Sequence, residues 1–453
     1  MAQLIDDESG VMPGLPDGAG YALPAAYAEA VEAQPAQVAS LWSHRNFLRL
    51  WGATGVSNLG THLSALALPL IAAVALQATA FQAGLLAAVG WLPYLLFGLF
   101  AGVWVDRMRR RPLLIGSDLG RAALYTVIPI SFALDRASIG LLMVVALLAG
   151  TLSVFYDVAN LSYLPTLVDR SQLVQANSRM TSTSSAAQIV GPGIGGVVIR
   201  LFGAPAAVVA DALSFLMSAT LIWRIDAPEP APQPRKPGSS VWSDIRGGFG
   251  IVLNSATLRA LALSAATVQV SGYAFLAIYV LYMTRDLGLS AAEVGLVLAT
   301  GGVGALVGAL LADPLRRWIG QGPAIVLALF MFGATGMLVP LAVLFPKWAL
   351  PLVVASEFLQ WLAIVASEVN SVSLRQAIVP DRMAGRVNGT MRFLSLGLRP
   401  VGSLLGGVLG GTAIGLAGTL VVAEFGMLVA FLWLMASPVR TLREAEPISE
   451  IGT

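Results

Sequence analysis

Long apolar stretches separated by short polar connections dominate the chain and predict helices that cross a membrane. A bilayer core about 30 Å thick requires about 20 apolar residues per helix, because each helical residue rises about 1.5 Å. A window of that length finds the following stretches: 48–77, 83–105, 112–134, 138–162, 181–202, 205–225, 258–284, 291–312, 321–345, 348–371, 391–412 and 415–436. We therefore expect an all-α membrane protein with twelve transmembrane helices.

The pattern changes between the sixth and seventh stretches to a polar segment rich in proline. Residues 226–240 contain five prolines, a density that favours extended conformations and prevents a continuous helix. From Val241 onward apolar residues recur every four positions, which indicates either an amphipathic helix on the membrane surface or a simple lead-in to the next span. The expected organisation is a flexible tail (1–40), a six-helix half (41–225), a linker (226–257), a second six-helix half (258–438) and a C-terminal tail (439–453).

The composition agrees with a chain that lies mostly in lipid. Hydrophobic residues make up 57% of the sequence and charged residues 11%, against about 25% charged in a soluble domain. The absence of cysteine excludes disulfides, thiol chemistry and Cys-ligated zinc. Two histidines, His44 and His62, are too few for a histidine metal cluster. We therefore expect no metal and no cofactor.

The positive charges predict the orientation. Of the 27 Lys and Arg residues, 21 fall in connections on the side that holds both termini, and four fall on the other side. Lys and Arg favour the cytoplasmic side of a membrane, so both termini should be cytoplasmic. The first 40 residues are acidic and lack a basic segment followed by an apolar run, which argues against a cleavable signal peptide. The predicted location is the plasma membrane of a bacterial-type cell.

The two halves share short sequence matches in the same order and at nearly one offset. These are GVWVDRMRRR (102–111) with ALLADPLRR (309–317), VDR (168–170) with PDR (380–382), and GPGIGG (191–196) with GSLLGG (402–407). Two similar halves of the same topology indicate a duplication about an axis along the membrane normal.

The loop 102–111 resembles the signature loop of the major facilitator superfamily, although its usual glycine before the arginine pair is Arg109 here. The wider sequence is similar to the branch of that superfamily with enterobactin exporters and macrolide efflux proteins, and the resemblance covers roughly 41–438. The supporting stretches are SNLGTHLSALALPL (57–70), WLPYLLFGLFAGVWVDRMRRRP (91–112), FYDVANLSYLPTLV (155–168), DALSFLMSA (211–219) and SLRQAIVPDRMAGRVNGTMRFLS (373–395). It implies the major facilitator fold, with two pseudo-symmetric six-helix halves that work by alternating access.

The resemblance also implies a gate at the cytoplasmic ends of the helices. Asp106 would lie near the N-terminus of the eleventh span, and the motif arginines would pair with Asp169 at the end of the fourth span in one state only. The alternative is that the arginines merely set the topology. The expected gating residues are Gly102, Asp106, Arg107, Arg110, Arg111, Asp169, Asp313, Arg316 and Arg317.

Glycine and proline gather in the fifth span, at Gly191, Pro192, Gly195 and Gly196. Small residues allow helices to approach closely, and proline permits bending. In the superfamily that the sequence resembles, such a motif is associated with exporters. Ordinary tight packing between the halves is the alternative interpretation.

Charged side chains within the spans are costly in a membrane and therefore mark partners or function. Asp118 and Arg121 are three residues apart on one helix face, which predicts either a self-neutralising pair or a proton or substrate site. Further candidates for coupling or substrate binding are His62, Asp157, Asp211, Glu357, Glu368, Arg399 and Glu424. Of these, Asp157, Asp211 and Glu368 lie nearer helix ends, where we expect them to be hydrated or capping.

One specific hypothesis concerns Arg399, which is near mid-depth in the eleventh span. It would pair with Glu357 or Glu424, and protonation of that acid would release it. The resembling branch often has an acidic residue after the glycine of the first span, where Thr61 and His62 follow Gly60 here. Either His62 replaces that acid or the coupling group lies elsewhere.

Other functional classes fit the sequence less well. A phosphate-binding loop ending in GK[ST] is absent, because Lys236 is followed by Pro and Lys347 by Trp. No nucleophile-base or metal motif indicates a membrane enzyme, and the repeat favours alternating access over a channel. We therefore expect a monomeric, proton-coupled exporter of small amphipathic molecules such as drugs, siderophores or metabolites, with no nucleic-acid partner. Import or uniport of a small metabolite is the alternative.

Overall fold

The computed structural model describes residues 41–98, 100–105, 107–229 and 241–443, in which every regular element is a helix. The predicted tail 1–40, most of the proline-rich linker, Asp106 and residues 444–453 lie outside the described residues. The described chain opens with a short 3-10 turn, η1 (Leu41–Ser43), which belongs to a small N-terminal unit. A second unit begins at Arg45 and holds all the long helices.

Twelve helices in the described residues are long and apolar enough to cross a membrane, as the sequence predicted. The N-half contains α2 (Arg45–Leu70), η2 (Ile71–Ala75), α3 (Ala80–Phe97), α4 (Ala101–Val105), α5 (Arg110–Ala133), α6 (Ile139–Tyr163), η3 (Leu164–Thr166), η4 (Arg170–Gln172), α7 (Leu173–Phe202) and α8 (Ala204–Trp223). After α9 (Val241–Asn254), the C-half contains α10 (Ala256–Arg285), α11 (Ala291–Ile319), α12 (Gln321–Gly336), α13 (Leu338–Leu341), η5 (Ala342–Leu344), η6 (Pro346–Trp348), α14 (Ala349–Ile378), α15 (Asp381–Gly397), α16 (Arg399–Gly410), α17 (Gly415–Met435) and η7 (Pro438–Thr441).

Several helix ends differ from the prediction because helices continue beyond the apolar window. α7 begins at Leu173 instead of 181, and α14 ends at Ile378 instead of 371. Their additional turns mix polar and apolar residues, so the apolar window did not include them. The eleventh span is interrupted at Leu398, between α15 and α16. Pro400 explains the interruption, because proline lacks an N–H and its ring clashes with the carbonyl four residues earlier.

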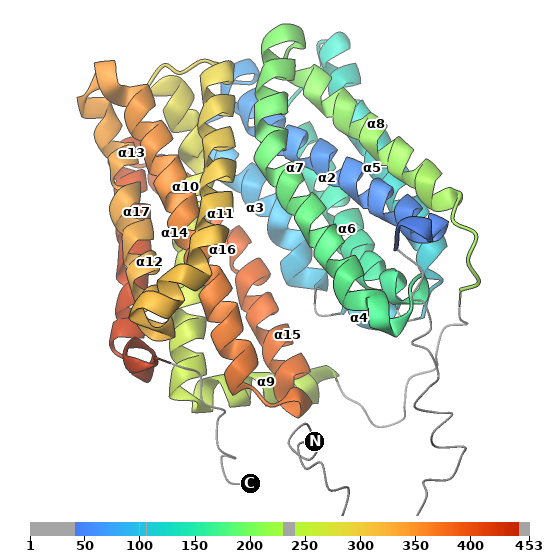
Figure 1. Cartoon of the computed structure of the whole chain (residues 1–453). Helices are drawn as coiled ribbons and strands as arrows, with labels where there is room; N and C mark the ends of the chain where they lie inside the picture. Colours follow the sequence, from blue (N-terminus) through green and yellow to red (C-terminus); the bar gives the residue numbers. More distant parts are fainter. Residues whose placement is uncertain (1–40, 99, 106, 230–240, 444–453) are drawn as a thin grey trace, which may run out of the picture. The chain divides into compact units, whose positions relative to one another are not determined.

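The same helix pairs recur in both halves. α2 packs against α7 and α8, and the corresponding α10 packs against α16 and α17. α3 packs against α6, as α11 does against α14. Across the two halves, α3 lies beside α16 and α7 beside α11 (Figure 1). The structure therefore has the internal symmetry that the repeated motifs indicated.

The two halves are in close contact at one end of the bundle. We call this the distal end, where α2, α7 and α10 end, and we call the end at which α2 begins the proximal end. A Cβ atom added to Gly84 would lie 2.4 Å from the Cα of Gly407, and one added to Gly196 would lie 3.0 Å from the Cα of Gly295. Arg285 also donates to the Ala73 carbonyl across the halves, at 3.1 Å. Only residues without a side chain permit such approaches.

The segment after the linker is a separate helix. α9 ends before Ser255, whose hydroxyl accepts from the Leu258 N–H and caps α10. Phe249 contacts Phe393 of α15, with ring centroids 6.2 Å apart. A Cβ on Gly248 would lie 2.4 Å from Thr390 Oγ1. The helix is therefore packed against α15, and is not merely a lead-in to α10.

Candidate functional site

A buried ion pair lies inside the N-half. Arg121 Nη2 donates to Asp118 Oδ1 at 2.5 Å, and the two residues are 5% and 0% exposed. The pair forms because both side chains lie on one face of α5, as their spacing predicted. The Arg121 guanidinium also lies 4.3 Å from the ring centroids of Tyr156 on α6 and Phe215 on α8. Both charges are therefore matched within one half.

Asp211 on α8 is fully buried, so the expectation that it is hydrated or capping was wrong. Its Oδ1 accepts from the Ser214 hydroxyl at 3.1 Å. A Cβ on Gly60 of α2 would lie 2.5 Å from the same oxygen. The glycine lets α2 cover Asp211, a contact between distant segments that the position of Asp211 in the sequence could not reveal.

The C-half has its own buried acids. Glu357 on α14 accepts from the Tyr279 hydroxyl and from the Trp361 indole N–H, each at 2.9 Å. Glu424 on α17 is 0% exposed, and neither of its oxygens accepts a hydrogen bond in the described part of the chain. The neighbouring Gln360 amide donates to the Ser356 hydroxyl, at 3.0 Å.

Arg399 does not pair with either of these acids, and the predicted ion pair was therefore wrong for this structure. Its guanidinium lies 4.3 Å from the Trp91 ring centroid and 4.8 Å from the Tyr273 ring centroid. These rings belong to α3 and α10, whereas Glu357 is held by residues of α10 and α14. Among the described residues no carboxylate forms an ion pair with Arg399, and its buried Nε donates no hydrogen bond.

An aromatic cluster extends from Arg399 into the N-half. The Trp91 ring lies 5.5 Å from Tyr273 and 5.4 Å from Tyr94. The Tyr94 hydroxyl donates to Asp157 Oδ2 on α6 at 2.8 Å. We call Trp91, Tyr94, Asp157, Tyr273 and Arg399 the interface cluster. The sequence showed its aromatic residues only as scattered positions, although Trp91 and Tyr94 share one helix face.

The fifth-span glycines contact two different helices. A Cβ on Gly191 would lie 2.5 Å from the Cβ of His62, which places half-buried His62 against the motif. Gly195 contacts Leu63 and Leu66 on the same helix, α2, while Gly196 faces Gly295 of α11. Tight packing accounts for these glycines.

Glu368, on α14, is exposed.

The motif loop contacts the end of α8 in this structure. The backbone N–H groups of Arg110 and Arg111 donate to the Glu229 carboxylate, and the Arg111 guanidinium donates to the Trp223 carbonyl. Arg107 is exposed. Asp169 is exposed and forms no ion pair in the part of the chain that the structure describes. Its pairing with the motif arginines stays a prediction for another state.

The corresponding segment of the C-half, in the last turns of α11, contains a local charge cluster. Asp313 pairs with Arg316 and Arg317 of its own helix, each at 2.7 Å. All three side chains are exposed. The cluster therefore links no two helices in this state.

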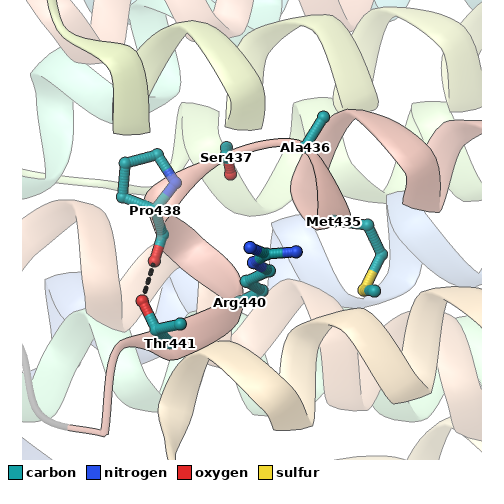
Figure 2. A pocket seen from close by; sticks show the side chains of 6 residues that line it. All are labelled: Met435, Ala436, Ser437, Pro438, Arg440 and Thr441. Carbon is teal, nitrogen blue, oxygen red and sulfur yellow. Dashed lines mark hydrogen bonds between the residues drawn. The ribbon is translucent and has the colours of Figure 1, made fainter.

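An open depression lies at the proximal end, where α17 turns into η7. Figure 2 shows its lining, from Met435 to Thr441, with the Thr441 hydroxyl donating to the Pro438 carbonyl at 3.0 Å. No residue predicted to act in transport lines it. The depression is thus separate from the buried charges.

Comparison with known proteins decides the family. Residues 50–395 match the model of the Major Facilitator Superfamily. The chain belongs to the Major Facilitator Superfamily. It is therefore a multi-pass secondary transporter with twelve spans, and not an enzyme.

Two relatives of this transporter are named for export. It is 28% identical over 392 residues to the multidrug efflux pump Tap of Mycolicibacterium fortuitum, covering 82% of this chain and 90% of that protein. It is 24% identical over 355 residues to the enterobactin exporter EntS of Citrobacter koseri, covering 77% and 82% of the two chains. The similarity to both extends over most of each protein.

Solved structures agree on the fold. A bacterial homologue of the iron transporter ferroportin superposes with a TM-score of 0.70 at 16% identity, covering 86% of this chain and 98% of that one. A peptide transporter of the POT family superposes with a TM-score of 0.68 at 13% identity, covering 90% and 99%. The transporter thus has the major facilitator fold that the signature loop implied.

Proposed function

We propose that this transporter exports small amphipathic molecules across the plasma membrane of a bacterial-type cell, driven by protons. The similarity to an enterobactin exporter and a multidrug efflux pump, over most of each chain, carries the proposal of export. The charges in the connecting loops support cytoplasmic termini, which would place the distal end outside the cell. The close glycine contacts then keep the outer side closed in this state.

Buried acids support proton coupling. Protonation of Asp118 would neutralise its carboxylate and leave the Arg121 guanidinium without its charge partner, which changes the balance of charge inside the N-half. Glu357 and Glu424 are the equivalent candidates in the C-half, because both are buried and neither has a basic partner in the described residues. A buried acid that gains and loses a proton is a means of coupling proton entry to a conformational change.

The driving force is sufficient for export. Moving one charge through a potential of 100 mV supplies about 2.3 kcal/mol. That energy sustains about a fifty-fold gradient when one proton enters for each neutral molecule that leaves. Alternation between states would use the gating residues Asp106 and Asp313 with their neighbouring arginines. The glycine contacts at the distal end would then have to separate.

The test uses inside-out vesicles that contain the overproduced transporter. A pH-sensitive dye reports loss of the proton gradient while drugs, siderophores and metabolites are added one at a time. We expect saturable, substrate-triggered loss of the gradient, and its absence from the Asp118→Asn variant. Loss that persists in that variant but disappears in Glu357→Gln or Glu424→Gln would place coupling in the C-half. Failure of every compound to move protons would contradict antiport, and inward accumulation by whole cells would favour import.

A further inference from the structure

Arg399 stands out among the charges of the spans because its charge is unmatched. By the rise per helical residue it lies roughly 16 Å from Gly410 at the distal end of its span, near the middle of the membrane. It forms no ion pair with a carboxylate in the described residues, and its Nε donates no hydrogen bond. The Trp91 and Tyr273 rings stabilise the cation through their faces. They do not neutralise it, and the described residues supply no negative partner.

The interface cluster is also accessible. Trp91, Tyr94, Asp157, Tyr273 and Arg399 are all partly exposed, although they lie within the spans. Charged residues at such depth face the interior of the bundle or a water-filled space, and not the lipid. The Asp118–Arg121 pair, by contrast, is closed to any ligand because its residues are almost fully buried. Arg399 is therefore more accessible to a ligand than Arg121.

Three of the acids in the spans already have partners. Asp157 accepts from Tyr94, Asp118 from Arg121, and Glu357 from two donors. A cationic ligand would have to displace one of these interactions. An anionic ligand would instead form an ion pair with Arg399 without displacing an existing one. A guanidinium binds carboxylates particularly well because its N–H donors form a planar fork.

We propose that Arg399, Trp91 and Tyr273 form a substrate subsite for organic anions. A carboxylate or phenolate of the substrate would bind the Arg399 guanidinium, and its apolar body would pack against the rings of Trp91 and Tyr94. The subsite takes residues from α3 in the N-half and from α10 and α16 in the C-half. Its occupant therefore contacts both halves. This inference rests on the proposed transport of small amphipathic molecules, but not on the direction of transport or on its coupling to protons.

The experiment measures binding to the purified, full-length transporter in lipid nanodiscs by equilibrium dialysis. Three radiolabelled probes share one ring system and differ in charge: naphthoate, neutral naphthamide and naphthylmethylammonium. We expect naphthoate to bind roughly 10- to 100-fold more tightly than naphthamide, because it forms charge-assisted hydrogen bonds. Arg399→Gln should remove that preference, and Arg399→Lys should keep part of it. Lys347→Gln removes an exposed positive charge outside the helices of the cluster and should leave the preference unchanged.

Several outcomes would contradict the proposal. Equal binding of naphthoate and naphthamide to the unaltered transporter would overturn it, as would a naphthoate preference that survives Arg399→Gln. Preferred binding of naphthylmethylammonium, lost in Asp157→Asn, would assign the site to cations. A gel-filtration profile unchanged in Arg399→Gln shows that the variant is folded, and partial rescue by lysine shows that charge is the cause. If the binding results hold while vesicles show no export, the subsite stands and the exporter proposal fails.

Discussion

Arg121 and Arg399 are alike in one respect and opposite in another. Each guanidinium lies close to two aromatic rings, at 4.3 Å from both for Arg121 and at 4.3 and 4.8 Å for Arg399. Arg121 also has the Asp118 carboxylate at 2.5 Å, while Arg399 has no carboxylate partner among the described residues. Both guanidinium groups therefore lie against aromatic rings, but only that of Arg121 has a counter-charge among the described residues.

The difference follows from where each arginine lies. Arg121 and its partners all belong to helices of the N-half, so they can stay together while the two halves move. Arg399 contacts a ring of the opposite half, so its surroundings must change whenever the halves separate. A counter-ion held in the same half, whose charge a proton can remove and restore, suits the first position. A replaceable counter-ion, brought by the substrate, suits the second.

The largest expected effect is the loss of stability on breaking the Asp118–Arg121 pair. Asp118→Asn leaves a buried guanidinium without its counter-charge and should lower the free energy of unfolding by about 3–5 kcal/mol. Chemical unfolding in detergent, followed by tryptophan fluorescence, measures the change. Arg399→Gln should cost far less in the same assay, because no ion pair is broken.

A double variant separates stability from coupling at the same pair. Replacing both residues by apolar ones, Asp118→Leu with Arg121→Met, removes both charges and should recover most of the lost stability. Proton release in vesicles should not return. Equal instability of Asp118→Asn and Arg399→Gln would remove the contrast between the two arginines.

A smaller effect is expected from widening the contact between the halves. The side chain in Gly84→Val would meet the backbone of Gly407, whose Cα lies 2.4 Å from the position of the new Cβ. Overpacking of this kind costs about 1–3 kcal/mol. Since α3 carries Trp91 and α16 carries Arg399, naphthoate binding should weaken correspondingly. Gly116→Val, where no atom lies within 4 Å of the new Cβ, is the matched control. Unchanged naphthoate affinity in Gly84→Val would show that the site does not depend on this contact.

The two arginines also show which kinds of contact could be predicted from the sequence. The Asp118–Arg121 pair was predictable because three residues along a helix fix its geometry locally. The twelve spans followed from apolar length for the same reason. The aromatic partners of Arg399 come from α3 and α10, and Gly60 covers Asp211 from another helix. Such contacts depend on how helices pack, which neither spacing nor hydropathy encodes. The sequence therefore predicted which residues carry charge but not the partner of Arg399.

A further variant tests whether the Tyr94 hydroxyl keeps Asp157 from binding cations. Tyr94→Phe removes the donor to Asp157 Oδ2 and should lower the free energy of unfolding by about 1 kcal/mol. The freed carboxylate should then bind naphthylmethylammonium a few-fold more tightly, by about the strength of the lost hydrogen bond. Equilibrium dialysis measures this gain, and Tyr94→Phe with Asp157→Asn should abolish it. No gain in cation affinity would mean that the hydrogen bond is not what excludes cations.

The smallest effect on stability is expected at Asp313, where charges of both signs are exposed. Its pairs with Arg316 and Arg317 are in contact with water or lipid headgroups, and exposed pairs of this kind contribute little to stability. Asp313→Asn should therefore leave the unfolding transition unchanged. If Asp313 takes part in the gate, the initial rate of proton release in vesicles should fall several-fold while naphthoate affinity stays the same. Asp135→Asn, at an exposed acid in the connection between α5 and α6, is the control for the loss of one negative charge. Equal rates in Asp313→Asn, Asp135→Asn and the unaltered transporter would exclude Asp313 from gating, because the exposed charge would then affect neither stability nor transport.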